Sequence, residues 1–85
     1  MAEKRLAYSA HANDAIGERE LDIAWIVRTA RDPDWVIADP ERPGVERRYR
    51  AIPNQGSRVL RGAVMEKPDE IRIITAFFDQ RARRP

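Results

Sequence analysis

The stretch SAHANDAIGERELDIAWIVRTA, residues 9–30, holds both predicted helices of this chain and sets the layout of the rest. In its second half, four apolar residues recur at the spacing of one helix face: Ile23, Ile26, Val27 and Ala30. That spacing predicts an amphipathic helix with one buried stripe. Asp22 precedes the stripe and suits an N-cap, because its carboxylate accepts hydrogen bonds from free N–H groups of the first turn. Pro33 disfavours helical geometry at Asp32, so we expect the helix to end there.

The first half of the stretch predicts a shorter helix that begins after Ser9, a second favourable N-cap. Two residues of the stretch leave alternatives open. Gly17 is destabilising by about 1 kcal/mol in a helix interior, so it either ends the first helix or lets another element come close. Trp25 lies off the apolar stripe of the second helix, and it either packs on Leu21 or belongs to a partner surface.

The chain on both sides of these helices predicts strands. Residues 4–8 form a short extended lead-in, and turn signals rich in proline and glycine separate four further strands, at residues 35–38, 46–52, 58–66 and 70–78. In the last strand, Ile71, Ile73, Thr75 and Phe77 are expected on one face, and Arg72, Ile74, Ala76 and Phe78 on the other. Apolar residues on both faces indicate a central position in the sheet.

These elements predict an α+β fold. We expect a short N-terminal strand followed by two short helices, packed on one face of a roughly four-stranded antiparallel sheet meander. With 85 residues, the chain is expected to form a single domain over residues 1–79, followed by a basic tail at 80–85. It contains no cysteine, and no apolar run has the length of a membrane span. We therefore expect a cytoplasmic protein without a membrane partner.

Charge is distributed unevenly along the chain. Residues 1–41 carry five Lys+Arg and nine Asp+Glu (5 − 9 = −4), and residues 42–85 carry eleven and five (11 − 5 = +6), which together give the net charge of +2. Fourteen of the sixteen basic residues are arginine, whose planar guanidinium suits bidentate phosphate recognition. The basic half thus indicates nucleic acid or an acidic protein as partner. The alternative is a set of ordinary solvated strand faces in an arginine-rich protein.

Several short motifs carry a family resemblance that covers most of residues 5–79. The first is Ser-x-His-Ala, which begins at Ser9, and the second is Arg19, eight residues after His11 and followed directly by Glu-Leu-Asp. The others are a Pro-x-x-Val turn and the final strand Arg-Ile-Ile-Thr-Ala-Phe-Phe. This pattern resembles the bacterial domain-of-unknown-function 4258 family, which is similar to the BrnT and RelE/ParE class of toxin folds. The resemblance implies a toxin-like ribonuclease of a toxin–antitoxin system, with RNA and an antitoxin protein as partners. An arginine common in the family four residues after the histidine is replaced here by Ala15.

Metal-independent RNA cleavage needs an acid, a base and cations on the phosphorane. His11 has the only side chain with a reference pKa near neutrality, so it is the candidate acid or base. A helical wheel aligns Glu18 with His11, where its carboxylate would orient the imidazole, and Arg19 would bind phosphate. Alternatively, His11 makes a structural hydrogen bond and Arg19 a salt bridge at the elbow between the helices. One histidine without clustered carboxylates predicts no metal or cofactor.

Five arginines are candidates for nucleic-acid binding: Arg48, Arg50, Arg58, Arg61 and Arg72. Arg48 and Arg50 alternate onto one face of their strand, and Tyr49 lies on the other. Two functions follow from these residues. The first is the toxin-like ribonuclease, and the alternative is a non-catalytic binding module of the same fold that uses its basic sheet for nucleic acid or a protein.

Overall fold

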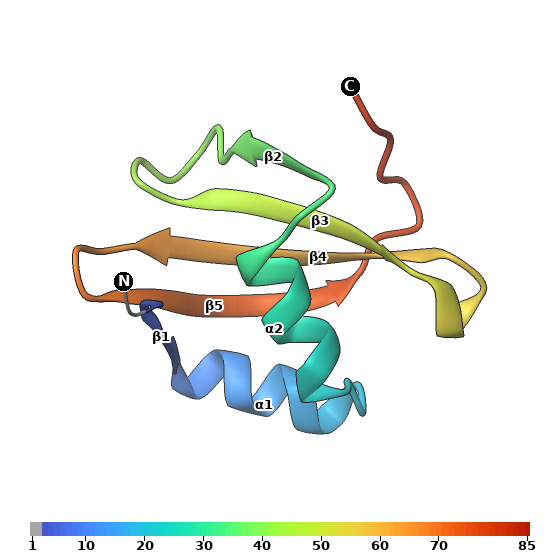
Figure 1. Cartoon of the computed structure of the whole chain (residues 1–85), viewed down its shortest axis with the longest axis horizontal. Helices are drawn as coiled ribbons and strands as arrows, with labels where there is room; N and C mark the ends of the chain where they lie inside the picture. The colour runs from blue at the N-terminus through green and yellow to red at the C-terminus, as the bar shows by residue number, and fades with distance from the viewer. Residues whose placement is uncertain (1–2) are drawn as a thin grey trace.

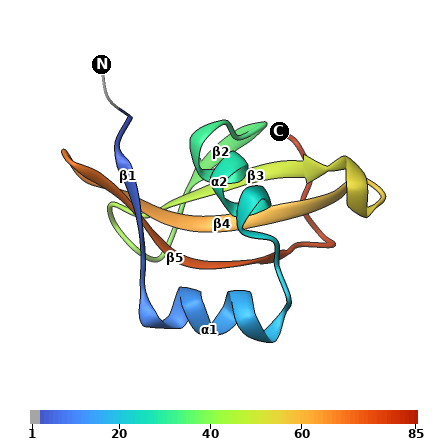
Figure 2. The same cartoon turned by 60° about the horizontal axis from the view of Figure 1, so that its bottom comes forward.

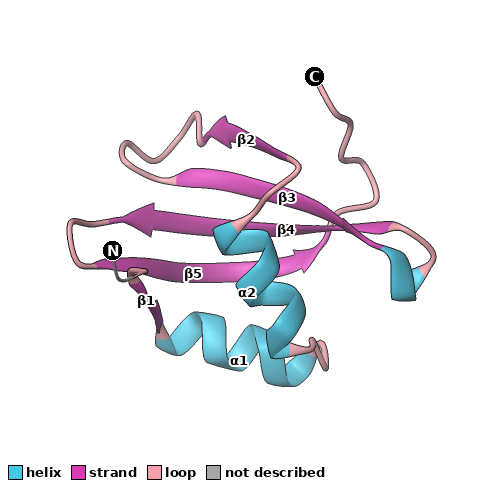
Figure 3. Cartoon of the chain, in the orientation of Figure 1, coloured by secondary structure: helices cyan, strands magenta, loops and turns pink. Residues whose placement is uncertain are grey.

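A computed structural model describes residues 3–85 and arranges them as one sheet with helices on one of its faces (Figures 1 and 2). In chain order the elements are β1 (Arg5–Tyr8), α1 (Ala10–Glu18), α2 (Ile23–Arg31), β2 (Trp35–Ala38), β3 (Glu46–Ile52), the short 3-10 helix η1 (Pro53–Gln55), β4 (Arg58–Glu66) and β5 (Glu70–Phe78). The predicted α+β class is confirmed. Figure 3 shows how much of the chain lies in strands.

The sheet has the strand order β1-β5-β4-β3-β2. Strands β2 to β5 form the expected antiparallel meander. The sheet nevertheless has five strands rather than about four, because the lead-in strand β1 pairs with β5 in parallel, with Leu6 opposite Ile71 and Tyr8 opposite Ile73. Strand β5 therefore lies between β1 and β4, and its predicted position inside the sheet is confirmed.

Both helices begin at the predicted N-caps. The Ser9 hydroxyl accepts from the N–H of Ala12 at 3.0 Å and donates to the carbonyl of Ile74, which ties the start of α1 to β5. The Asp22 carboxylate accepts from the N–H of Ala24 at 2.8 Å. Helix α1 ends just after Gly17, and no other element lies within 4 Å of the place where a Cβ on Gly17 would stand. Neither helix described in residues 3–85 is long and apolar enough to cross a membrane.

The core lies between the helices and the sheet, and two residues of the predicted α2 stripe, Ile23 and Val27, are outside it. Ile26 and Ala30 are buried against β4 and β5, whereas Ile23 is 49% exposed. Thr29 is buried, although it was not part of the predicted apolar stripe. Its hydroxyl donates to the carbonyl of Trp25 at 2.8 Å, so the buried polar group has a partner within its own helix.

A register shift in β5 corrects the predicted alternation of its side chains. Val64 of β4 pairs with Ile73 and Ala63 pairs with Thr75, so Ile74 is an extra residue in β5. Because one extra residue moves all later side chains to the opposite face, Ala76 and Phe78 lie on the helix-covered face together with Ile71 and Ile73. Phe77 consequently lies on the open face.

The predicted basic tail contains no helix or strand, but it does contact the sheet. It leaves the end of β5 and returns toward β2 (Figure 1). There, Arg84 donates to the carbonyl of Asp34 at 3.0 Å, and its guanidinium carbon lies 6.0 Å from the centre of the Trp35 ring.

Candidate nucleic-acid interface

Arg48, one of the predicted nucleic-acid ligands, is part of the packing between α2 and the sheet. It is only 8% exposed. Its guanidinium donates to the carbonyl of Ala30, in the last turn of α2, at 2.6 Å, and to carboxylate oxygens of Glu46 and Glu66 at 2.8 and 2.6 Å. The pKa of Glu66 is lowered to about 2, first by a hydrogen bond from Lys4 and then by the one from Arg48. Arg48 therefore has no free donor edge for a phosphate.

Three other predicted arginines also pair with carboxylates. Arg50 pairs with Asp32 at 3.3 Å, Arg61 with Asp79 at 3.2 Å, and Arg72 with Glu70 at 3.1 Å. Arg48 and Arg50 share one face, as the alternation predicted, but the strand register makes it the helix-covered face. Arg61 and Arg72 lie on the open face. The five predicted arginines therefore do not form one phosphate-binding surface.

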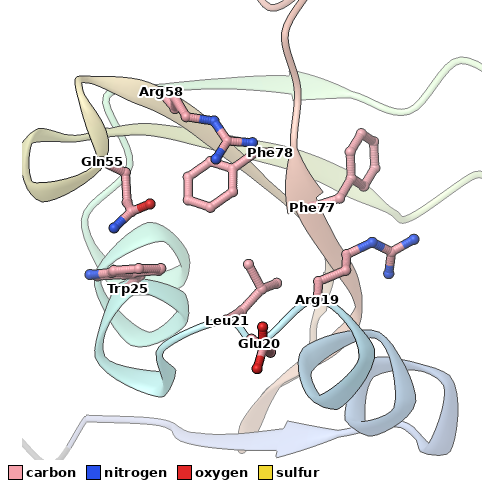
Figure 4. A pocket seen from close by; sticks show the side chains of 8 residues that line it. All are labelled: Arg19, Glu20, Leu21, Trp25, Gln55, Arg58, Phe77 and Phe78. Atoms are coloured by element: carbon pink, nitrogen blue, oxygen red, sulfur yellow. The ribbon is translucent and has the colours of Figure 1, made fainter.

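Arg19 and Arg58 differ from this group, because neither forms an ion pair with the described residues. Both line a cavity of about 550 Å³ between the α1–α2 elbow, the start of β4 and the end of β5 (Figure 4). We call it the elbow cavity. Its lining residues are Arg19, Glu20, Leu21, Trp25, Gln55, Arg58, Phe77 and Phe78.

Aromatic rings and one amide complete the wall of the elbow cavity. The rings of Trp25 and Phe78 meet edge to face at 5.9 Å, and the guanidinium of Arg58 lies over the Phe78 ring at 4.2 Å (Figure 4). Gln55 comes from η1, which ends at Gly56 in the left-handed region with a φ of 64°. The cavity thus combines cations for phosphate, rings for stacking and an amide that both donates and accepts hydrogen bonds.

Glu20 supplies the only carboxylate in the lining of the elbow cavity. Its φ of 52° lies in the left-handed region, which a non-glycine residue adopts with some strain. The residue follows the C-cap of α1, Arg19, and turns the chain toward α2. Strained backbone of this kind is frequent at functional sites. This φ belongs to the turn that ends α1, in which the N–H of Leu21 donates to the carbonyl of Ile16 at 3.0 Å, and a left-handed residue at this place is common at helix ends.

His11 and Glu18, predicted to be catalytic with Arg19, lie outside the elbow cavity. Both are exposed; His11 lies in the first turn of α1 and Glu18 at its last residue. Seven residues of helix rise about 10 Å, so alignment on the wheel does not bring the two side chains into hydrogen-bond contact. The expected alternatives are not seen either: neither the His11 side chain nor the Arg19 side chain bonds to another residue of the described 3–85 range. The structure brings Arg19 to the cavity and leaves His11 and Glu18 apart from it.

The fold and this cavity define a small α+β domain with an arginine-lined and aromatic-lined recess at its helical elbow. Comparison with protein families gives a match over residues 8–78 to the family described as "Domain of unknown function (DUF4258)", and the chain belongs to that family. No curated protein and no solved structure matches it. The similarity to BrnT and RelE/ParE toxins stays a prediction. Within residues 3–85, no group of three or more His, Cys, Asp or Glu is placed to hold a metal ion.

Proposed function

We propose that this protein binds single-stranded RNA in the elbow cavity as a non-catalytic module. One observation carries the proposal. Of the six arginines predicted as site residues, the two without an ion pair among the described residues, Arg19 and Arg58, line the same cavity. Guanidinium groups that are not already paired keep their donors for phosphate oxygens.

The rest of the lining favours a single strand over a duplex. A-form duplex RNA is recognised mainly through its shape and backbone, whereas unpaired bases are splayed out and stacked on aromatic side chains. A volume of about 550 Å³ lies in the range of small-ligand pockets, so it suits one nucleotide better than a helix. The half-buried rings of Trp25 and Phe78 and the Gln55 amide would contact the base, and Arg58 and Arg19 the phosphate.

A toxin-like ribonuclease is the second candidate, and Glu20 is the observation that favours it. A carboxylate beside two unpaired arginines supplies a base for the 2′-hydroxyl and cations for the phosphorane. The cavity lacks a second titratable group to protonate the leaving oxygen, because His11 and Glu18 do not line it. This is why we place binding first. An antitoxin protein would be the partner of the catalytic form.

Fluorescence anisotropy with a labelled single-stranded RNA of mixed sequence, at low salt, tests the proposal. We expect Arg58→Gln and Arg19→Gln each to weaken binding about tenfold, the loss typical of one charge-assisted hydrogen bond. Arg72→Gln is the matched control: it removes the same charge from an arginine already paired with Glu70, and we expect a change of less than about twofold. Absence of binding by the wild type, or equal affinity in all four proteins, would contradict the proposal.

A cleavage assay on the same RNA separates the two candidates. Intact RNA after prolonged incubation, with and without ribosomes, supports the non-catalytic module. Cleavage by the wild type that falls about 10²–10⁴-fold in Glu20→Gln, the usual contribution of acid–base catalysis, would instead assign the ribonuclease to the elbow cavity. If His11→Gln lost cleavage and Glu20→Gln kept it, the result would support the catalytic role that the sequence predicted for His11.

A further inference from the structure

We infer that the RNA path continues past Trp25 into a second cavity, which takes the neighbouring nucleotide of the strand. This inference rests on the proposed function. The second cavity has a volume of about 400 Å³ and lies between the start of α2 and the end of β3. Trp25, Arg28 and Asn54 line it, together with Asp22 and Arg50.

Trp25 connects the two recesses, because its side chain lines both of them. The indole is half-buried and held by its edge-to-face contact with Phe78, so the ring has a fixed orientation between the cavities. Adjacent residues of η1 face the two sides: Gln55 lines the elbow cavity and Asn54 the second cavity. Each cavity therefore contains one side-chain amide, and the Trp25 ring lies between the two cavities. This arrangement suits two successive nucleotides of one strand.

The charges of the second cavity also favour a phosphate. Arg28 is exposed on α2 and forms no ion pair within the described residues. Arg50 is held by Asp32 at 3.3 Å, and Asp22, whose Oδ1 accepts from the N–H of Ala24 as the N-cap of α2, is the one carboxylate of the lining. Arg28 is thus a free cation on the far side of Trp25 from Arg19 and Arg58. A dinucleotide or longer strand would meet unpaired arginines on both sides of the ring.

A length series tests this second cavity. Uridine monophosphate, a uridine dinucleotide and a uridine tetranucleotide are titrated against the wild type, Arg28→Gln and Arg31→Gln, with intrinsic tryptophan fluorescence as the readout. Arg31 is the matched control, since it lies on the same helix but is paired with Glu3 at 3.2 Å. We expect wild-type affinity to rise about tenfold or more from one nucleotide to four. Arg28→Gln should lose most of that gain and keep the affinity for the monophosphate, and Arg31→Gln should behave as the wild type.

Three results would overturn the inference, and one of them also removes the proposed function. Equal affinity for all three lengths would limit the site to the elbow cavity. Equal losses in Arg28→Gln and Arg31→Gln would reduce the role of Arg28 to its contribution to net charge. Failure of every length to bind the wild type would remove both proposals, whereas binding that is independent of length removes only the second cavity.

Discussion

Arg48 and Arg58 illustrate how similar arginines on neighbouring strands acquire different roles. Arg48 is buried, and its donors are used by a helix carbonyl and two carboxylates. Arg58 is exposed at the start of β4, where its guanidinium lies over the Phe78 ring and beside the elbow cavity. The difference comes from the acidic neighbours that each position meets in the sheet. Residue type alone therefore did not show which arginine has a structural role and which is free to bind phosphate.

The variant Arg48→Gln tests this distinction. We expect the free energy of unfolding to fall by about 1–3 kcal/mol, because the Ala30 carbonyl loses a buried charged donor. RNA affinity of the folded protein should not change. The check is urea denaturation combined with the anisotropy assay.

The pH dependence of stability gives a second readout for the same variant. The pKa of Glu66 in the folded protein is about 2, below its ordinary 4.5, so its interactions stabilise the fold above about pH 4.5 and are lost as pH falls toward 2. Because Arg48 contributes to that shift, the loss of stability on acidification should be smaller in Arg48→Gln. If Arg48→Gln bound RNA more weakly than the wild type and had unchanged stability, Arg48 would instead be part of the RNA-binding site.

Helix α2 is the element on which both the core and the two cavities depend. Its buried side contributes Ile26, Thr29 and Ala30 to the packing against the sheet, and Trp25 and Arg28 lie along the cavities. A helix of nine residues has little stability of its own. Its packing through Ile26 therefore positions the site.

The change Ile26→Ala is expected to lower the free energy of unfolding by about 2–5 kcal/mol. Ile26 is 3% exposed, so removing most of its side chain leaves a cavity in the core. Ile23→Ala, at a position 49% exposed on the same helix, should change it by less than about 0.5 kcal/mol. Thermal or urea unfolding of the two variants makes the comparison. Similar losses in both would mean that α2 packs through a different face.

Element boundaries were predictable from the sequence because their signals are local. N-caps at Ser9 and Asp22, and proline-rich and glycine-rich turns, fixed both helices and the four later strands, and the structure confirms them. The parallel pairing of β1 with β5 and the extra residue Ile74 were not predictable, since both depend on contacts between residues about 65 or 10 positions apart. The elbow cavity shares this limit: its walls come from the connection between α1 and α2, from α2 itself, and from η1, β4 and β5.

Over the whole molecule, the acidic and basic halves of the chain partly neutralise each other. Asp32 and Asp39 from the first half pair with Arg50 and Arg47 from the second. The pKa of Asp39 is lowered to about 2, first by a hydrogen bond from the Glu41 backbone and further by its arginine neighbours. The excess of arginine in the sheet therefore does not produce a uniformly basic face. The unpaired arginines at the two cavities are where a phosphate would find free donors.

The salt dependence of RNA affinity tests this account most directly. Each phosphate contact that releases a counterion adds about −0.7 to the slope of log K against log salt for a single strand. We predict that Arg58→Gln reduces the steepness of the wild-type slope by about 0.7, and that Arg72→Gln leaves it unchanged. A slope in Arg58→Gln equal to that of the wild type, or a reduction of the same size in Arg72→Gln, would contradict phosphate binding at the elbow cavity.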